Sequence, residues 1–174
     1  MLVGPSGSGK STLLHIIAHV LPPSTGQVSF HNTKLTKEDV TLVLQTPYFF
    51  GDLSLYDNIA LVRNFNKTKG RRYIKEIARL FKIEQILKRR ANVCSGGEKA
   101  RANLVRGIYE NKDILLIDEP TAHLDYTNSV YVAKTLAAVA KNKLVIVTTH
   151  EPEIFNAKNT CRLTLMEGKL YRYD

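Results

Sequence analysis

No apolar stretch in the sequence approaches the roughly 20 residues that a membrane-spanning helix requires. The longest one, residues 13–21, is interrupted by His15 and His19. The start of the chain also lacks the basic and apolar regions of a secretion signal, because a glycine-rich segment at residues 4–10 takes their place. We therefore expect a cytosolic protein that does not itself cross a membrane.

Cysteine is scarce, and the two that are present, Cys94 and Cys161, lie far apart without CxxC spacing. This arrangement predicts neither a disulfide framework nor a zinc site. Internal repeats and low-complexity tracts are absent as well. With 174 residues, of which 44% are hydrophobic and 24% charged, the chain has the composition of a folded globular protein and the length of one domain, residues 1–174.

The net charge of +9 is concentrated in one stretch. This stretch contains Lys67, Lys69, Arg71, Arg72, Lys75, Arg79, Lys82, Lys88, Arg89 and Arg90. Such a cluster could attract nucleic acid or an anionic membrane surface. Basic runs are more commonly the solvated face of helices, so we do not expect nucleic acid as a partner.

Three short and nearly continuous apolar runs, at residues 40–44, 114–117 and 144–147, are typical of strands that are buried on both faces in a parallel sheet. Residues 1–3 predict the end of a fourth strand, followed by a glycine-rich turn and a helix from Lys10 to about Val20. The predicted fold class is therefore α/β, a mainly parallel sheet flanked by helices.

Other segments complete this fold. A short strand is expected at residues 27–30, and the apolar spacing of Ile74, Ile77, Ala78 and Phe81 predicts a helix within a small helical subdomain at about residues 48–92. The chain ends with a hairpin signal, in which residues 162–166 and 169–173 flank a Glu167-Gly168 turn.

A phosphate-binding motif follows the first strand. Residues 4–11 fit GxxxxGK[ST] and consist of Gly4, Pro5, Ser6, Gly7, Ser8, Gly9, Lys10 and Ser11. In this motif backbone N–H groups close around a phosphate chain, Lys10 reaches the terminal phosphates and Ser11 offers its hydroxyl to magnesium. Taken alone, the motif predicts a phosphate-binding protein without specifying the reaction.

Two carboxylates, Asp118 and Glu119, follow the apolar run at residues 114–117, where a parallel sheet presents groups to ligands. Asp118 can hold the magnesium shell, and Glu119 can orient or deprotonate an attacking water. The alternative is a strand that simply ends in a charged turn.

A second candidate phosphate site lies at Ser95, Gly96, Gly97 and Glu98, ahead of a helical run from Ala100 to about Tyr109. Ser95 and Glu98 have the spacing of a capping box, so one interpretation is a well-formed helix start. The two glycines favour a further role, because they allow a phosphate to approach the backbone at the positive end of the helix.

The order of these motifs with Gln45, Leu124-Asp125 and His150 resembles the ATP-binding cassette (ABC) ATPases over essentially the whole chain. The resemblance implies a P-loop NTPase that binds and hydrolyses MgATP between two cassettes arranged head to tail. It places Thr12 and Gln45 in the nucleotide site, with Gln45 near the metal and the transmembrane partner. Asp125 would cross the dimer interface, and His150 would contact the γ-phosphate and act in catalysis with Glu119.

The sequence departs from the family pattern at three places. By the resemblance, Ser95–Glu98 correspond to the signature motif of the family. Cys94 replaces the leucine that commonly opens this motif, and Glu98 replaces a glutamine. Only Met1, Leu2 and Val3 precede the phosphate-binding motif, where family members carry antiparallel strands and an aromatic residue that stacks on adenine. We therefore expect the N-terminal strands to be missing.

The segment between residues 11 and 95 has no room for a long coiled coil, which favours a transporter at the cytoplasmic face of a membrane. Residues 45–50 and 54–59 resemble the exporter version of this region, so export is the expected direction, with a second ABC ATPase domain and a transmembrane domain as partners. Two alternatives stay open. One is a soluble ABC ATPase that acts on the ribosome or nucleic acid, and the other is a nucleotide-binding module without turnover.

Overall fold

The computed structural model describes residues 1–63, 67–158 and 160–173, and its centre is a six-stranded sheet. In order across the sheet the strands are β4 (Val40–Val43), β5 (Ile114–Asp118), β6 (Leu144–Thr148), β1 (Leu2–Val3), β7 (Arg162–Met166) and β8 (Lys169–Tyr173). All neighbours are parallel except β7 and β8. The α/β fold and the mainly parallel sheet are thus confirmed.

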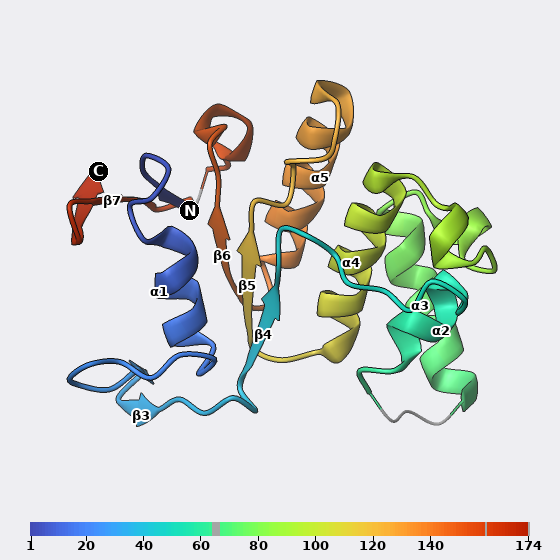
Figure 1. The fold of residues 1–174 in the computed structure, drawn as a ribbon, viewed down its shortest axis with the longest axis horizontal. Coiled ribbons are helices and arrows are strands. Elements are labelled where there is room, and N and C mark those ends of the chain that lie inside the picture. Colours follow the sequence, from blue (N-terminus) through green and yellow to red (C-terminus); the bar gives the residue numbers. More distant parts are fainter. Residues whose placement is uncertain (64–66, 159, 174) are drawn as a thin grey trace.

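Helices cover both faces of the sheet (Figure 1). On one face lies α1 (Lys10–Ile17), and on the other lie α4 (Gly96–Glu110) and α5 (Tyr126–Val139). Strand β5 explains this arrangement, because its side chains alternate. Leu116 joins the cluster around Leu14 of α1, whereas Leu115 and Ile117 join the larger cluster with α4 and α5. Because both faces of β5 are buried, all of its central residues are apolar, which gives a continuous apolar run in the sequence.

Helix α4 lies unusually close to β4. A Cβ atom at Gly107 would overlap Val43 Cγ2, so a larger residue would push the helix away from the strand. Beyond β4 the chain remains attached to α4, because Asn103 Nδ2 donates to Leu44 O at 3.0 Å and Arg106 Nη1 donates to Tyr48 O at 2.6 Å. The Arg106 guanidinium also lies over the Phe49 ring. The segment after β4 is thus held along one side of α4.

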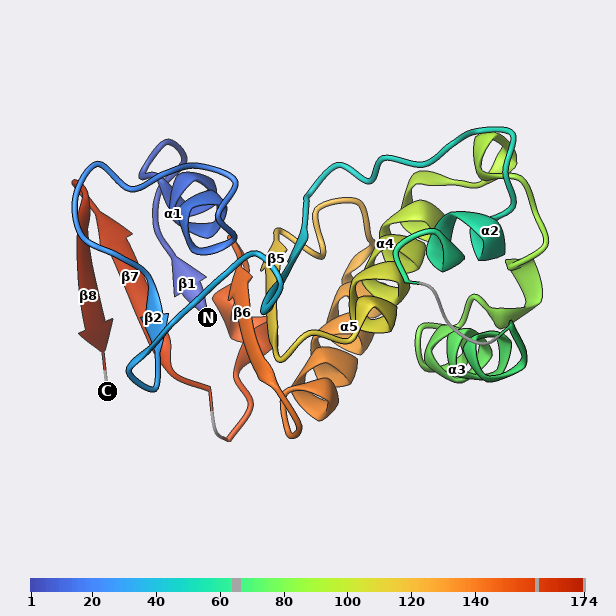
Figure 2. The same cartoon turned by 90° about the horizontal axis from the view of Figure 1, so that it is seen from below.

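A group of short helices packs beside α4 on the side away from the sheet (Figure 2), and we call it the helical lobe. Its elements are α2 (Leu55–Ala60), α3 (Lys67–Leu80), η1 (Glu84–Ile86) and η2 (Ala91–Val93). Ile74, Ile77, Ala78 and Phe81 are buried, as their spacing predicts. The limits of a separate subdomain at residues 48–92 stay a prediction.

The ends of several elements differ from the expectation. Helix α1 stops at Ile17 instead of near Val20, because His19 adopts a left-handed conformation with φ of 56°. The helix therefore ends before Pro22 and Pro23 are reached. The expected strand at residues 27–30 is shorter, and its two residues in β2 (Ser29–Phe30) pair with β3 (Thr33–Lys34), which the sequence did not predict.

The hairpin of β7 and β8 is confirmed with its predicted limits. Both turn residues have positive φ, 50° at Glu167 and 74° at Gly168, as expected for a tight two-residue turn. The remaining described element is η3 (Pro152–Phe155). None of the helices in the described ranges is long and apolar enough to span a bilayer.

Candidate functional site

The phosphate-binding loop connects β1 to α1. A side chain at Gly4 would overlap the carbonyl oxygen of Leu165, and Gly9 precedes the helix with φ of 96°, so both positions require glycine. Lys10 is 7% exposed, and its Nζ donates to Gly4 O at 2.9 Å and Pro5 O at 3.0 Å. The ammonium group therefore lies at the loop, beside the backbone that would surround a phosphate chain.

Several hydrogen-bond donors gather at this loop. The first bond of α1 runs from Leu13 N to Gly9 O at 2.8 Å, so the N–H groups of Lys10, Ser11 and Thr12 have no partner inside the helix. The Ser8 hydroxyl is buried, and no hydrogen-bond partner is found for it among the described residues. Donors gathered at a helix N-terminus suit an anionic ligand.

Asp118 and Glu119 lie at the carboxyl end of β5, where Thr148 of the neighbouring strand holds both. The Thr148 hydroxyl donates to Asp118 Oδ1 at 2.6 Å and accepts from Glu119 N at 3.0 Å. Asp118 is only 7% exposed. One threonine therefore fixes the positions of two consecutive residues at the end of the strand.

The side chain of Glu119 lies next to that of His150, which follows β6. Glu119 Oε1 is 3.2 Å from His150 Nε2, and the two side chains are 11% and 53% exposed. Burial raises the pKa of the Glu119 carboxyl, and the nearby His150 and Lys10 oppose this shift. Glu119 also has a left-handed backbone with φ of 47°. A carboxylate with a raised pKa at a ligand-facing sheet edge suits a general base.

Gln45 lies just beyond the end of β4 and is exposed. Together with Asp118 and Glu119 it lines a small cavity of about 10 Å³, which also contacts Asn103 and His123. A cavity of this size holds about one water molecule. The structure thus brings together three residues that come from the ends of two adjacent strands, and their roles stay a prediction.

Magnesium fits the donors that the sequence singles out. Ser11, Gln45 and Asp118 offer a hydroxyl, an amide carbonyl and a carboxylate oxygen, and Mg²⁺ prefers such oxygen ligands. No group of three or more histidine, cysteine or acidic side chains within the described ranges could form a metal cage. This is compatible with Mg²⁺, which is commonly held by one or two carboxylates together with phosphates and water.

The signature residues form the start of α4. Ser95 Oγ accepts from Glu98 N at 3.2 Å while Ser95 N donates to Glu98 Oε2 at 2.8 Å, which completes a capping box. Arg89 adds an ion pair to Glu98 at 3.0 Å. The capping interpretation is therefore correct for the single chain. It does not exclude phosphate binding, because the Ser95 hydroxyl acts only as acceptor in the box and keeps its own proton to donate.

Asp125 caps α5 in the same way. Its carboxylate accepts from Asn128 N at 2.9 Å and Asn128 Nδ2 at 2.6 Å, and these bonds hold the pKa of Asp125 below its ordinary value. Asp125 therefore stabilises the start of α5 within the single chain, in addition to any contact with a second cassette.

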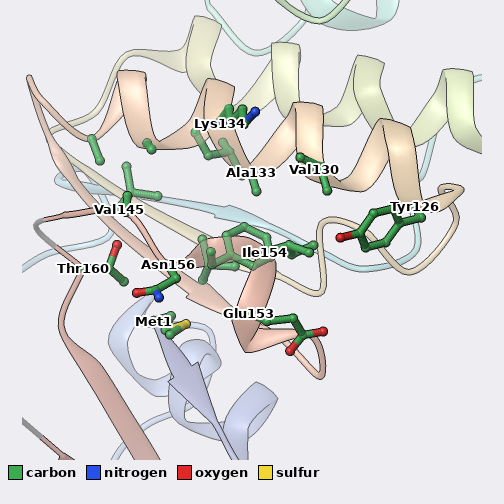
Figure 3. A pocket seen from close by; sticks show the side chains of 16 residues that line it. Met1, Tyr126, Val130, Ala133, Lys134, Val145, Glu153, Ile154, Asn156 and Thr160 are labelled. Atoms are coloured by element: carbon green, nitrogen blue, oxygen red, sulfur yellow. The ribbon is translucent and has the colours of Figure 1, made fainter.

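The two predicted phosphate sites lie in different parts of the fold. The P-loop lies at α1, whereas the signature and Asp125 begin α4 and α5 on the other side of the sheet (Figure 1). An apolar hollow of about 410 Å³ between α5, η3 and Met1 contains none of these residues (Figure 3). The two predicted phosphate sites therefore lie at the starts of helices on opposite faces of the sheet.

Sequence reasoning missed several residues that shape this region. Thr148 and Asn103 are buried polar residues that bond to Asp118 and to the end of β4, and Thr121 donates to Glu151. The only sequence signal was the Thr148-Thr149 pair at the end of an apolar run. Its partners lie on other strands and cannot be found from spacing.

Comparison with known proteins identifies the family. The model of the family described as ABC transporter matches residues 1–122. The chain belongs to the ABC transporter family. The sequence-based prediction of an ABC ATPase with a P-loop NTPase fold is thus confirmed.

Two curated relatives are named as import proteins. The chain is 29% identical to the phosphonates import ATP-binding protein PhnC of Fusobacterium nucleatum over 99% of its own length and 79% of that protein. It is 34% identical to the molybdate/tungstate import ATP-binding protein WtpC of Methanocaldococcus jannaschii, and the match covers 87% of this chain but only 53% of WtpC. These names do not support the expectation of export.

Solved ABC structures share the fold. A bacterial Atm1-family ABC exporter with ATP bound matches with a TM-score of 0.85 at 27% identity, and the match covers 98% of this chain and 32% of the exporter chain. A dimeric ATP-binding cassette in a post-hydrolysis state with ADP and Pi matches with a TM-score of 0.84 at 25% identity, over 98% of this chain and 83% of that one. The likeness therefore extends over nearly the whole chain.

Proposed function

We propose that the chain binds MgATP at Gly4–Thr12 and hydrolyses it in a head-to-tail dimer of two ABC cassettes. One observation carries the catalytic part of the proposal: the partly buried Glu119 carboxylate lies 3.2 Å from His150 at the sheet edge that also presents Asp118. Glu119 accepts the proton of the attacking water, and His150 orients the carboxylate and the γ-phosphate.

Binding in this proposal depends on the loop. Lys10 and the free N–H groups at the start of α1 hold the β- and γ-phosphates, while Ser11, Gln45 and Asp118 hold the metal. Mg²⁺, when bound, neutralises charge that develops on the phosphate oxygens. Ser95, Gly96 and Gly97 donate to the γ-phosphate bound by the opposite cassette. This pairing accounts for the separation of the two predicted phosphate sites within one chain.

The proposed role in the cell is to energise transport as the ATP-binding part of a membrane transporter, at its cytoplasmic face. Names of the curated relatives support import over the export that residues 45–59 suggest. The exposed side chains of Tyr48 and Phe50, 75% and 56% accessible, follow Gln45 and suit contact with the transmembrane partner.

The rate of ATP hydrolysis by the Glu119→Gln variant tests the proposal. We expect phosphate release to fall by at least about a hundredfold, the range for loss of a general base, while ATP affinity is retained. Lys10→Ala is the matched control and should abolish ATP binding itself. Near-normal turnover by Glu119→Gln would assign the base to another residue, and a wild-type chain without ATP affinity would refute the proposal as a whole.

A further inference from the structure

A second contact connects the turn after Glu119 with the loop that carries His150. Thr121 Oγ1 donates to Glu151 Oε2 at 3.1 Å. Thr121 is buried, at 4% exposure, and Glu151 is half-buried. The first partner lies two positions after Glu119, and the second directly follows His150. The hydrogen bond therefore spans the same two loops as the contact between Glu119 and His150.

Each partner of this hydrogen bond belongs to a tight turn. Leu124 N donates to Thr121 O at 3.0 Å and Ala122 N donates to Glu119 O at 3.2 Å. In the other loop Glu151 N donates to Thr149 Oγ1 at 2.9 Å. Hydrogen bonds within each turn fix its local shape. The hydrogen bond between Thr121 and Glu151 therefore limits how far the two loops can move apart.

Two hydrogen bonds hold the starts of these loops at the sheet, because Glu119 N donates to Thr148 Oγ1 at 3.0 Å and Thr149 N donates to Leu2 O of β1 at 3.2 Å. The last pair in the register of β5 and β6 is Asp118 with Thr148, and both loops begin beyond it. The His150 side chain is 53% exposed, so its surroundings alone do not fix its orientation. The hydrogen bond between Thr121 and Glu151 lies beyond these contacts and adds a side-chain link between the two loops that carry Glu119 and His150.

We propose that Thr121 and Glu151 are a positioning pair that holds His150 against Glu119. The inference rests on the proposed function, which gives Glu119 and His150 their roles. Neither Thr121 nor Glu151 contacts the reacting groups, so the pair acts through the geometry of its neighbours. Displacement of a catalytic group by about 1 Å can cost about a hundredfold in rate, so a single hydrogen bond at this place has a measurable effect.

Kinetics of four substitutions in the full chain test the pair. Thr121→Val removes the donor with little change of shape, and Glu151→Ala removes the acceptor. Both should lower kcat by about ten- to a hundredfold and leave the KM for ATP within about threefold. The conservative controls Thr121→Ser and Glu151→Gln keep a donor and an acceptor, and should stay within about threefold of the wild-type kcat.

The double variant Thr121→Val/Glu151→Ala adds a coupling test. Since both changes break the same bond, the double variant should be no slower than the slower single variant. Multiplied losses would overturn the inference, as would a changed KM with normal kcat. Equal losses in Thr121→Val and Thr121→Ser would overturn it too, because they would show that the hydroxyl does not matter.

A measurement without turnover separates this inference from the proposed function. The imidazole NMR signal of His150 should shift or broaden in Thr121→Val and remain unchanged in Thr121→Ser, with the other histidines as internal reference. An unchanged His150 signal in Thr121→Val would refute the positioning role even in an active enzyme. A wild-type chain that binds ATP without hydrolysing it would refute the proposed function and leave this spectroscopic result interpretable.

Discussion

Gly97 of the signature packs against Leu124 in the same chain, because a Cβ atom at Gly97 would lie 3.2 Å from Leu124 Cδ2 and 3.3 Å from His123 O. At Gly96 no atom lies within 4 Å of the corresponding position. The two adjacent glycines therefore differ in what a larger residue would do. A side chain at Gly97 requires Leu124 or the backbone at His123 to shift, whereas one at Gly96 extends into open space, where the other cassette is expected.

Nucleotide-dependent dimerisation follows from this difference. In the Glu119→Gln background, we expect the chain to dimerise with ATP and to stay monomeric with ADP, because ADP lacks the γ-phosphate that joins the two halves. Adding Gly96→Glu should abolish the ATP dimer, since the new carboxylate would repel the phosphate. Sedimentation with each nucleotide measures both outcomes.

Thermal unfolding supplies the control for this pair of glycines. Gly96→Glu should unfold within a few degrees of the parent, and Gly97→Glu should unfold at a clearly lower temperature because of the close contact with Leu124. If Gly96→Glu still dimerises with ATP, then Ser95–Glu98 is only a helix cap and our assignment of the signature is wrong.

Removal of His150 tests its contact with Glu119. His150→Ala should lower ATP turnover by about tenfold or more with little loss of ATP affinity, since the imidazole touches the carboxylate rather than the phosphate-binding loop. The substitution also removes a group that lowers the pKa of Glu119, so this pKa should rise further. Steady-state hydrolysis and a nucleotide-binding titration measure the two effects, and an equal loss of affinity would contradict this role.

Nucleic-acid binding distinguishes the transporter from the soluble alternative. Lys69, Lys75 and Lys88 of the helical lobe are exposed, and no ion pair is found for them among the described residues. We expect weak RNA and DNA binding that falls steeply between about 50 and 200 mM salt, since each neutralised phosphate releases counterions. Filter binding at the two salt concentrations measures this. A tight complex at the higher one would favour the soluble ABC ATPase.

The cap of α5 predicts a pH-dependent effect on stability. Hydrogen bonds from Asn128 lower the pKa of Asp125 in the folded chain. The stability that the carboxylate contributes is therefore complete above the unfolded value of about 3.9 and is lost as the pH falls through the lower folded value. The gap between the urea midpoints of wild type and Asp125→Ala should be full at pH 7 and smaller near pH 3. A gap independent of pH would show that the charge plays no part.

Much of the fold was predictable because its signals are local. Apolar runs predicted β4, β5 and β6, and the Glu167-Gly168 pair predicted the turn of the final hairpin. Both turn residues have positive φ in the structure. The ends of α1 and β2 were less accurate, because they depend on conformations such as the left-handed His19 that no residue pattern announces. The pairing of β2 with β3 was missed because neither two-residue strand has a periodic signal.

For the site, the sequence predicted the residue types and not their contacts. Spacing placed Glu119 and His150 at the ends of two strands, and only the order of those strands in the sheet makes them neighbours. The hydrogen bonds of Thr148, Asn103 and Thr121 connect segments that are distant in sequence, so no local pattern could reveal them. The capping box at Ser95 was found from spacing because both partners lie in one turn.

The hydrogen bonds between α4 and the segment after β4 connect the surroundings of Gln45 to the signature. The signature lies at the start of this helix. Further along, Asn103 bonds to Leu44 O and Arg106 bonds to Tyr48 O. One turn after Asn103, Gly107 packs directly against Val43. At Gly107 the helix leaves no room for a Cβ atom beside Val43. Because these contacts connect the segment beside Gln45 to the helix that begins at the signature, a displacement of that segment would act on α4 through Asn103 and Arg106.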